Sequence, residues 1–378
     1  MKNYIKSIIL LLALLATGTP ALADTFLVDG IYYNIEGSNA TVTHSPIPFH
    51  SNFYTGDVTI PETVTHNGTT YPVTKIGESA FAGCTGVTSV SIPNSVTYID
   101  DEAFDGCSGL TNMTIPASVN HIGSAVFMYC TGLSSIVVAS GNARYDSRGN
   151  CNAIIETEYD FLVSGCKNTV IPNTVKTIGD RAFSGCSDLT SITIPDSVTD
   201  IGENAFGACT GLTTVTIPNS VTYIGYGAFE DCSGLTSVSI GNSVTYIGFT
   251  TFFGCIGLKS VTCLAVEPPT IYSDTFDSAN YSNATLYVPD ESMIAYITAS
   301  YWKNFNNIRL ISEQPGELPG DVDGDGNVGI GDVSALIDYL LSGDATGVNQ
   351  AAADADGNGH VDIGDVSALI DYLLSGHW

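Results

Sequence analysis

The chain has 378 residues, of which 44% are hydrophobic and only 13% are charged. Its 39 acidic and 11 basic residues give a formal net charge of −28 at pH 7, and such a field repels nucleic acids and anionic membrane surfaces, because phosphate binding requires clusters of lysine and arginine. The apolar content is too high for a chain kept disordered by its charge, so we expect a folded protein with a large core, no nucleic-acid partner and no membrane insertion.

The segment 1–23 has the pattern of a secretory signal peptide. Two lysines precede an unbroken apolar run from Ile8 to Ala16, and Ala21-Leu22-Ala23 gives a small-x-small cleavage pattern. The run is too short to span a bilayer. Cleavage after Ala23 would leave Asp24, rather than a cysteine that could carry a lipid, at the new N-terminus. We therefore expect the mature chain to be secreted, either extracellular or associated with the cell surface.

Cysteines recur at one fixed interval through the middle of the chain and mark an internal repeat. They form two evenly spaced series, which are Cys84, Cys107 and Cys130, and then Cys186, Cys209, Cys232 and Cys255. The wider gap from Cys130 to Cys186 equals one ordinary unit plus one longer unit. The longer unit covers roughly Val138 to Val170.

Each unit reads Leu-x-x-(Ile/Val/Met)-x-Ile-Pro, then Val-Thr-x-Ile-Gly, then Ala-Phe-x-x-Cys. The alternation of Leu110, Met113 and Ile115 predicts a short strand with one buried face, and Pro116 ends it because proline cannot donate to a strand ladder. A unit of this length cannot enclose a core alone, so stacked neighbours must share one. We therefore predict a mainly β solenoid of about nine coils over residues 58–262.

These units resemble the BspA-like leucine-rich repeats of bacterial surface antigens. The resemblance implies a cap at each end of the solenoid, because a bare terminal coil would expose its apolar columns. Residues 24–57 would form the N-terminal cap, and their Asp29-Gly30 pair independently predicts a tight hairpin turn. Residues 263–311 would form the C-terminal cap, and residues 312–319, which contain two prolines, a semi-rigid linker.

Two columns of side chains on the predicted coils are candidates for ligand binding. One is an uncharged ladder between the buried strand positions, consisting of Asn112, Thr114, Ser191, Thr193, Thr214, Thr216, Ser237 and Ser239. The other contains Tyr98, His121, Thr177, Asp200, Tyr223 and Tyr246. Exposed tyrosines and hydroxyls could contact a protein or a glycan. Alternatively, each tyrosine packs over its neighbour in a repeated stack.

The ten cysteines do not predict a disulfide framework. Seven fall on the repeat period, where side chains that stack in parallel have poor geometry for pairing, so we expect reduced, buried thiols there. Cys151, Cys166 and Cys263 lie off the period, and the sequence leaves their state open. The sequence contains no Cys-x-x-Cys motif, so a zinc site is not predicted. It also contains no His-Glu-x-x-His, phosphate loop or Gly-x-Ser-x-Gly. We therefore predict a protein that is not an enzyme.

Two loops near the C-terminus have the spacing of EF-hand calcium loops. The predicted ligands of the first loop are Asp321, Asp323, Asp325, the backbone carbonyl of Asn327, and Asp332. Those of the second are Asp354, Asp356, Asn358, the carbonyl of His360, Asp362 and Asp365. Residues 320–378 contain eleven aspartates and no lysine or arginine, so their mutual repulsion favours a bound cation. Two loops in the same register predict two calcium ions.

An identical segment follows each loop, from Ile330 to Gly343 and from Ile363 to Gly376. The apolar stripe of an amphipathic helix is predicted at Val333, Leu336, Ile337, Leu340 and Leu341. The two prolines of the linker exclude a full incoming helix, and loop position 12 is Asp rather than the Glu of an EF-hand. Both departures resemble the type I dockerin, which implies a small all-α, calcium-binding module over residues 320–378.

The dockerin resemblance also implies a cohesin-type protein partner. The family's contact positions correspond to Ile330, Gly331, Ile337 and Asp338, and in the second copy to Ile363, Gly364, Ile370 and Asp371. The family often has hydroxyl and basic residues at these positions, and this chain has neither. Ile337 and Ile370 are alternatively core residues of their helices. The near-identity of the two copies suggests the hypothesis that either copy can face the partner.

Taken together, these patterns predict a secreted, non-catalytic binding protein. Its dockerin would attach it to a cohesin-bearing assembly while the repeats recognise a protein or a glycan. Because dockerins accompany glycan-degrading complexes, the chain could be an accessory in polysaccharide breakdown. The alternative is a surface adhesin that holds host or neighbouring-cell proteins through its repeats. A glycoside hydrolase is the weakest alternative, since no paired acid site is visible.

Overall fold

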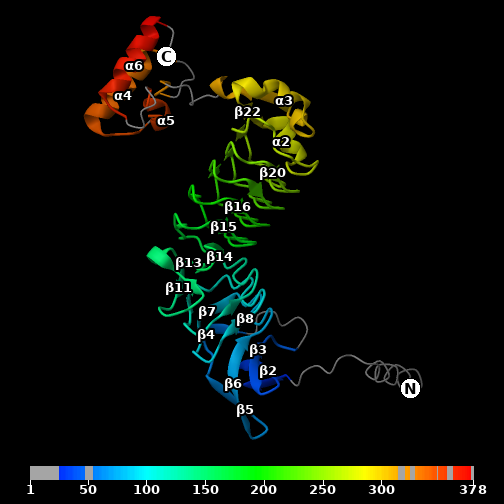
Figure 1. Cartoon of the computed structure of the whole chain (residues 1–378). Helices are drawn as coiled ribbons and strands as arrows, with labels where there is room; N and C mark the ends of the chain where they lie inside the picture. The colour runs from blue at the N-terminus through cyan, green and yellow to red at the C-terminus, as the bar shows by residue number, and fades with distance from the viewer. Residues whose placement is uncertain are drawn as a thin grey trace, which may run out of the picture.

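The computed structural model describes residues 25–46, 54–313, 320–323, 328–346, 348–355 and 361–375, with the backbone alone at residues 350 and 351. Residues 1–23, predicted as a signal peptide, and residues 314–319 of the predicted linker lie outside these ranges. The described residues form a long β-solenoid and a small helical module (Figure 1). The predicted fold class is therefore confirmed.

Three tight hairpins begin the solenoid. Strands β1 (Phe26–Val28), β2 (Ile31–Glu36) and β3 (Asn39–Thr43) pair in antiparallel order and form the first two. The turn between β1 and β2 has positive φ at Asp29 and Gly30, as the sequence predicted, because this turn type matches the twist of the strands. A third hairpin joins β5 (Thr63–His66) to β6 (Thr69–Ile76). Strand β6 pairs in parallel with β3, which connects these hairpins to the first coil.

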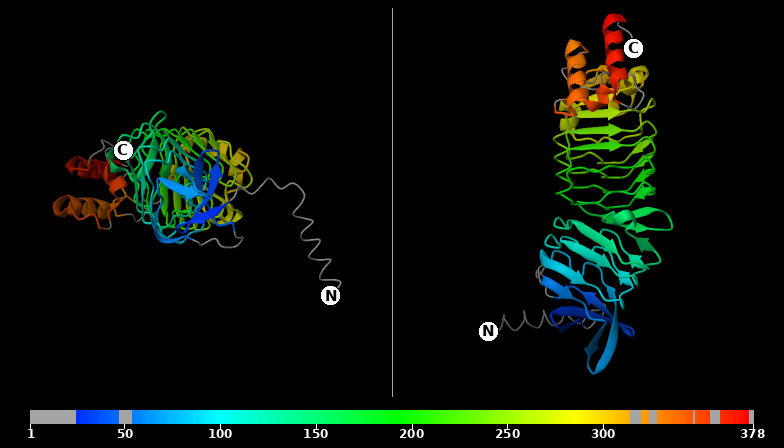
Figure 2. Two further views of the ribbon diagram at one scale, coloured as in Figure 1. Left: turned by 90° about the horizontal axis from the view of Figure 1, so that it is seen from below. Right: turned by 90° about the vertical axis from the view of Figure 1, so that its left-hand side faces the viewer.

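One side of the solenoid is a ladder of mostly four-residue parallel strands (Figure 2). Its strands are β4 (Thr55–Thr59), β7 (Gly86–Ser91), β9 (Asn112–Ile115), β11 (Ser135–Val138), β17 (Thr214–Ile217), β19 (Ser237–Ile240), β21 (Ser260–Cys263), β22 (Thr285–Val288) and β23 (Asn307–Leu310). Within the regular coils the paired residues are one repeat apart, as in the match of Val215 with Val238. The sequence period is therefore the length of one coil.

A second side carries shorter strands of the same period. They are β8 (Tyr98–Ile99), β10 (His121–Ile122), β15 (Thr177–Ile178), β16 (Asp200–Ile201), β18 (Tyr223–Ile224) and β20 (Tyr246–Ile247). We call this set the short-strand ladder. Its strands pair in parallel from β6 to β10 and again from β14 (Phe161–Gly165) to β20. Between these two runs lies the long unit.

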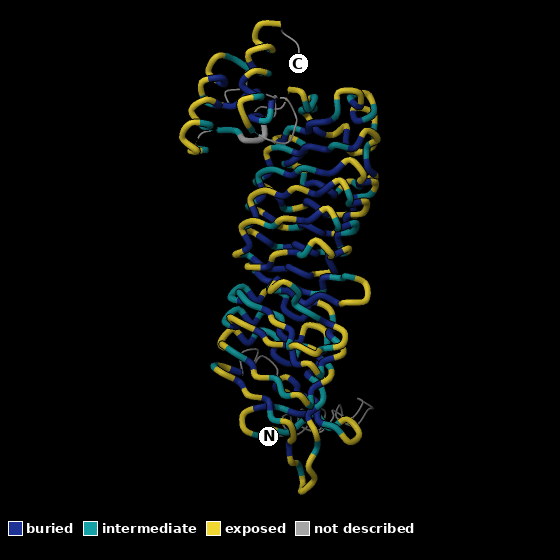
Figure 3. Tube along the Cα trace, turned by 60° about the vertical axis from the view of Figure 1, so that its left-hand side comes forward, coloured by how far each residue is buried: buried dark blue, intermediate teal, exposed yellow. Residues whose placement is uncertain are grey.

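A column of stacked phenylalanines fills the interior. Successive rings, such as Phe206 and Phe229, lie 5.1 Å apart and almost parallel. Each ring stands on the ring one coil earlier, so every coil covers the apolar surface of its neighbour. In Figure 3, dark blue stretches of buried residues recur along the tube from coil to coil. The column has a gap between Phe127 and Phe183, on the two sides of the long unit.

Cysteines form a second buried column beside the phenylalanines. All ten are buried and none forms a disulfide, which agrees with the prediction for the seven on-period cysteines. Five of the seven on-period thiols donate to the phenylalanine carbonyl of the preceding coil, as Cys232 does to Phe206 at 3.1 Å and Cys255 to Phe229 at 3.1 Å. Each of these carbonyls also accepts the backbone N–H of the cysteine in its own coil, so the thiol adds a second hydrogen bond that links one coil to the next.

The long unit interrupts the stack. Its chain forms β12 (Tyr145–Asp146), the 3-10 turn η2 (Arg148–Asn150), and the antiparallel strands β13 (Ala153–Glu156) and β14. The buried apolar residues accordingly fall into two clusters that meet here, one with Ile154 and Cys166 and the other with Ala153 and Ile155. The solenoid is thus two stacks joined at a hairpin, visible as a change in the run of the coils in Figure 2.

Short helices and aromatic side chains cover the last coil. They are α2 (Ser278–Asn283), η3 (Asp290–Ser292), α3 (Met293–Thr298), η4 (Trp302–Asn304) and η5 (Ile311–Glu313). Trp302 packs against Phe276, the last ring of the column, at 5.8 Å, and its indole N–H donates to the carbonyl of Pro269. These contacts keep the final apolar column out of water. The helical module contains α4 (Ile330–Ser342), α5 (Gln350–Ala353) and α6 (Ile363–Ser375).

Candidate metal centre

The helical module has a small core of its own. Leu336 of α4 and Leu369 of α6 are fully buried against each other's helices, together with Val322, Val333, Ala353, Ala355 and Val366. Residues at equivalent positions of the two copies therefore occupy equivalent places in the core. This packing holds the entrance of each loop next to the start of the helix that follows it.

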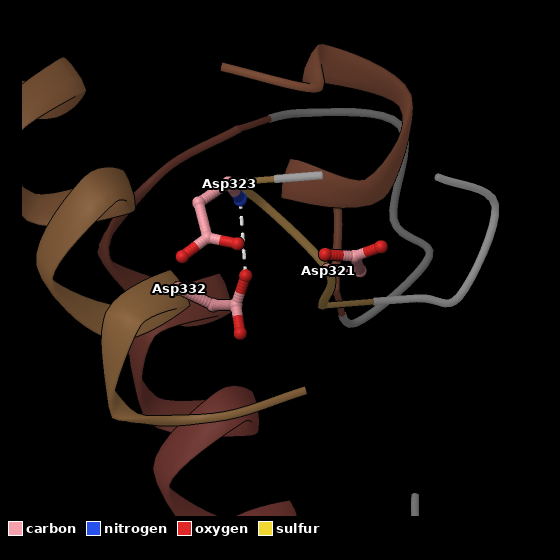
Figure 4. A group of neighbouring side chains, drawn as sticks. All are labelled: Asp321, Asp323 and Asp332. Carbon is pink, nitrogen blue, oxygen red and sulfur yellow. Dashed lines mark hydrogen bonds between the residues drawn. The ribbon is translucent and has the colours of Figure 1, made fainter. Parts of the chain in front are cut away.

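The first loop brings three predicted ligands together. Carboxylate oxygens of Asp321, Asp323 and Asp332 all lie within 4.8 Å of one another. Figure 4 shows Asp321 and Asp323 on the loop and Asp332 at the start of α4. Asp321 and Asp332 are buried, whereas Asp323 is exposed. Oxygen ligands in this arrangement suit a hard cation such as Ca²⁺, which accepts several carboxylates at flexible distances.

The Asp332 carboxylate also organises the loop. One oxygen accepts the backbone N–H of Asp323 at 3.0 Å, and the other accepts the backbone N–H of Gly329 at 2.6 Å. Asp332 thus caps α4 and faces the other two carboxylates. A Cβ at the neighbouring residue Gly331 would lie 2.6 Å from Oδ2 of Asp323, so a side chain there would displace this carboxylate.

The second loop repeats the capping contacts. The N–H of Asp362 donates to Oδ2 of Asp365 at 2.7 Å, and Oδ1 of Asp362 accepts the N–H of Gly364 at 2.6 Å. Asp365 is buried, as its counterpart Asp332 is. Among the described residues of this loop, no group of three carboxylates converges. Predicted ligands outside the described residues are Asp325 and Asn327 in the first loop and Asp356, Asn358 and His360 in the second.

The predicted contact residues lie on the surface of the module. Ile330 and Ile363 are 81% and 72% exposed, and Ile337 and Ile370 are 37% and 42% exposed. Asp338, Asp371 and Gly331 are exposed, and Gly364 is half-buried. The alternative that Ile337 and Ile370 are core residues is therefore wrong.

The predicted apolar stripe of the helices is only partly buried. Only Val333 and Leu336 are buried and Leu340 is half-buried, whereas Ile337 and Leu341 point away from the core. Leu341 and its counterpart Leu374 are each 82% exposed. The stripe is wider than the surface that the partner helix covers, so its outer edge with Ile330 forms an exposed apolar row.

One element of the module was absent from the sequence prediction. Helix α5 begins after Asn349, whose side chain accepts the N–H of Ala352, and it ties the two copies together. The N–H of Gly320 donates to the carbonyl of Ala352, and that of Asn349 to the carbonyl of Val322. Asn followed by Gln-Ala-Ala-Ala is a recognisable helix start, because Asn is a good N-cap and alanine a strong helix former.

On the solenoid, the tyrosine column packs as the second of the two alternatives describes. Tyr98 and His121 stack with centroids 3.9 Å apart, and Tyr223 and Tyr246 stack at 5.1 Å. The ring edges of Tyr223 stay partly exposed. The uncharged ladder of hydroxyl and asparagine side chains lies on the side with the four-residue strands, which we call the long-strand side. Shallow pockets of about 460 Å³ and 410 Å³ lie there over Thr214 and Asn112.

A solenoid of short, regular coils joined to a pair of loop–helix repeats defines a repeat protein with a calcium-loop module. The model of the BspA type leucine rich repeat region matches residues 50–152 and 154–283 in six copies. The chain belongs to this family, and it carries a dockerin type I domain at residues 319–374. No curated protein matched the chain.

Several solved structures are similar to the solenoid. A leucine rich cell surface protein from Faecalibacterium prausnitzii is 21% identical, with 78% of this chain and 96% of that one covered and a TM-score of 0.39. The pneumococcal vaccine antigen PcpA is 17% identical over 77% of this chain and 99% of its own, with a TM-score of 0.45. A leucine-rich repeat protein from Bacteroides ovatus is 23% identical over 76% of both chains, with a TM-score of 0.38.

Both families are non-catalytic interaction domains, so the chain has a protein-interaction role. Type I dockerin domains bind calcium, and proteins with these two domains are typically extracellular or bound to a surface. Within the part of the chain that the structure describes, no helix has both the length and the apolar character needed to cross a membrane.

Proposed function

We propose that this protein is an exported, non-catalytic adaptor whose dockerin attaches it to a cohesin-type partner in the presence of calcium. The observation that supports this most is the convergence of Asp321, Asp323 and Asp332 at the start of a helix whose outer face is apolar and exposed. A loop that binds an ion and a helix that presents a surface are thus part of one unit.

Two calcium ions are proposed, one in each loop. The ligands of the first are Asp321, Asp323, Asp325, Asn327 and Asp332, and those of the second are Asp354, Asp356, Asn358, His360, Asp362 and Asp365. The supporting argument is electrostatic: no lysine or arginine occurs between residues 320 and 378, so neither side chain type is present to pair with the buried carboxylates Asp332 and Asp365, and a bound cation would supply the missing positive charge. Calcium binding would then contribute directly to folding of the module.

The partner is proposed to contact Ile330, Gly331, Ile337 and Asp338, or the matching set Ile363, Gly364, Ile370 and Asp371. The exposed isoleucines and the leucines next to them give each set an apolar row without a basic residue. Such a row fits a partner with an apolar patch, because removing exposed isoleucine and leucine side chains from water favours association. Either set alone could hold the partner, since the two segments are identical in sequence.

The solenoid is proposed to recognise a protein or a glycan, with polysaccharide breakdown as the process that the assembly serves. Uncharged hydroxyls along the long-strand side and partly exposed tyrosines along the short-strand ladder support a recognition surface. The alternative, an adhesin that holds host or neighbouring-cell proteins, rests on the same surface and differs in the role of the dockerin.

A pull-down of the full-length chain with cohesin domains from the same organism tests the docking proposal. Binding is expected with calcium and is expected to be lost with EGTA. Ile337→Asp or Ile370→Asp alone should retain binding, and the two together should abolish it. Ile294→Asp is the matched control, because Ile294 is 75% exposed on α3, outside the dockerin. Calcium-independent binding, or none to any cohesin, would refute the proposal.

A further inference from the structure

The long unit opens a wedge between two coils of the solenoid. The N–H of Tyr129 donates to the carbonyl of Ser184 at 3.0 Å, which is the contact that neighbouring coils make elsewhere, although the whole long unit lies between the two residues in sequence. Two residues before Ser184, the carbonyl of Ala182 accepts the N–H of Gly165, which belongs to β14 of the long unit and not to the coil that contains Tyr129. The coils therefore touch at one corner, and β14 separates them beside it.

A pocket of about 420 Å³ lies in this wedge. Its walls are apolar and come from both sides of the break, with Ile122 and Tyr145 on one side and Phe161 and Val163 on the other. Phe161 and Val163 are only half-buried, although residues next to them in β14 are fully buried. A concave site with apolar walls and a few converging polar groups is the usual form of a ligand pocket.

The backbone edge beside the pocket is already capped. Strand β10 ends its run of the short-strand ladder, and the Tyr145 hydroxyl accepts the N–H of Ile122 at 3.1 Å. The Arg144 guanidinium donates to the carbonyl of Asn120 at 3.1 Å and to the carboxylate of Glu156 at 3.2 Å. Because these side chains occupy the edge, an added β-strand is excluded and the pocket must be filled by a side chain or a small group.

The charges that line the pocket are mostly negative. Asp101 and Asp180 each have one oxygen held by a backbone N–H, from Ser124 and from Glu203, both at 2.8 Å. The structure gives the second oxygen of each no hydrogen-bond partner within its described residues. Glu156 is buried against Arg144, so the three carboxylates and one guanidinium sum to a formal charge of −2.

The one imidazole in the lining does not offset this charge. Burial and the nearby Arg144 guanidinium lower the pKa of His121 below its usual value, which keeps the ring neutral at pH 7. His121 also stacks on Tyr98, whose other face receives the ammonium of Lys75 at 4.8 Å. The ammonium of Lys75 thus lies over a ring and the guanidinium of Arg144 lies in an ion pair, and the residues that line the pocket carry surplus negative charge.

We propose that this pocket binds a lysine or arginine side chain of a partner protein. The apolar stem of such a side chain fits between Phe161, Val163 and Ile122, and its cationic head meets the carboxylates of Asp101 and Asp180 at the rim. An anion is repelled by the same carboxylates, and a neutral sugar leaves them without a countercharge. The net charge of the whole chain, −28, draws basic partner surfaces towards it.

This inference deepens the solenoid half of the proposed function and does not depend on the dockerin half. The test uses the full-length chain in saturating calcium, so that the aspartate loops do not bind the probe. N-acetyl-arginine amide and N-acetyl-lysine amide are titrated by saturation-transfer NMR, with N-acetyl-norleucine amide as the neutral isostere and methyl glucoside as the sugar probe. We expect both cationic probes to bind and the two neutral probes to bind more weakly.

The matched variants separate the pocket from the general charge. Asp101→Asn with Asp180→Asn keeps the amide acceptors for Ser124 and Glu203 and should weaken the cationic probes about tenfold, as expected for two lost ion pairs. Asp196→Asn with Asp290→Asn makes the same charge change at exposed positions elsewhere and should have no effect.

Equal weakening in both double variants, or equal binding of the norleucine or glucoside probe, would overturn the assignment. Cohesin binding is measured on the same samples. If the parent chain binds the cationic probes but no cohesin, the result counts against the docking proposal alone. If it binds cohesin but not the cationic probes, the result counts against the pocket alone.

Discussion

Removal of calcium should loosen the helical module while the solenoid stays folded. Asp321, Asp323 and Asp332 hold their carboxylate oxygens within 4.8 Å of one another, and two of these residues are buried. With no cation between them, the three negative charges oppose the folded loop. The solenoid coils contain no such cluster among their described residues, so a chelator has no comparable target there.

Coulomb's law gives the size of the effect. Two unit charges 4.8 Å apart repel by about 1 kcal/mol in water and by about 3.5 kcal/mol at the effective dielectric of a protein surface, so three pairs oppose folding by about 3 to 10 kcal/mol. Saturating calcium at a hundred times its Kd stabilises each site by about 2.7 kcal/mol. A small domain has only about 5 kcal/mol of stability to lose, so two empty loops should leave the module largely open.

Hydrogen exchange of the full-length chain, read by mass spectrometry, measures this directly. EGTA should raise exchange in α4 and α6 and leave β17, β19 and β21 unchanged. Asp323→Asn gives a sharper test, because it removes one exposed carboxylate from the cluster without removing a helix cap. In EGTA it should raise the free energy of opening of α4 by about 1 kcal/mol after solvent screening and so slow its hydrogen exchange. In calcium it should speed the exchange of α4, because one ligand of the ion is weakened.

Asp338→Asn is the matched control for that variant, since Asp338 carries the same charge on the exposed side of α4. It should leave the hydrogen exchange of α4 nearly unchanged both in calcium and in EGTA. Exchange in α4 that is identical with calcium and with EGTA would refute the reasoning. So would an Asp323→Asn chain that is less stable than the parent in EGTA, because relief of repulsion requires the opposite sign.

Three further predictions concern other parts of the chain. Phe206→Ala should destabilise the solenoid by about 3–5 kcal/mol in chemical denaturation, because the ring is fully buried between two others, whereas Phe253→Ala at an exposed position should cost less than about 0.5 kcal/mol. Gly331→Ala should weaken calcium binding in calorimetry, since its methyl group would displace the Asp323 carboxylate; unchanged affinity would show that the carboxylate moves freely. Burial raises the pKa of the Cys186 thiol to about 12, so between pH 7 and 9 the thiol stays protonated and iodoacetamide should label it only after unfolding, as peptide mapping would reveal.

Much of the solenoid was predictable because its repeat unit fixes one coil at a time. The even spacing of the cysteines correctly predicted the length of one coil, and the position of cysteine after Ala-Phe correctly predicted a buried thiol. Local rules also predicted the Asp29-Gly30 turn. The hairpin at Asn67-Gly68 carries the same turn signal and was not among the predictions.

The long unit shows where such rules end. Its extra residues were visible in the sequence, but which coil edges it separates depends on the direct contact between Tyr129 and Ser184, and no local pattern specifies a contact between residues so distant in sequence. The prediction for the helical module was incomplete for a different reason. The five residues of the predicted amphipathic stripe are apolar alike, so the pattern does not show that the partner helix covers only its inner edge and that Ile337 and Leu341 remain exposed.

The two proposed sites depend on different physical terms, which makes them separable by experiment. The pocket in the wedge has a net negative charge but a scaffold built from apolar stacking, so high salt should weaken its ligand while leaving its shape intact. The module has the reverse dependence, since its shape itself relies on cation binding and its proposed contact row is apolar. Cohesin binding should therefore depend on calcium far more than on ionic strength, and probe binding at the solenoid on ionic strength far more than on calcium.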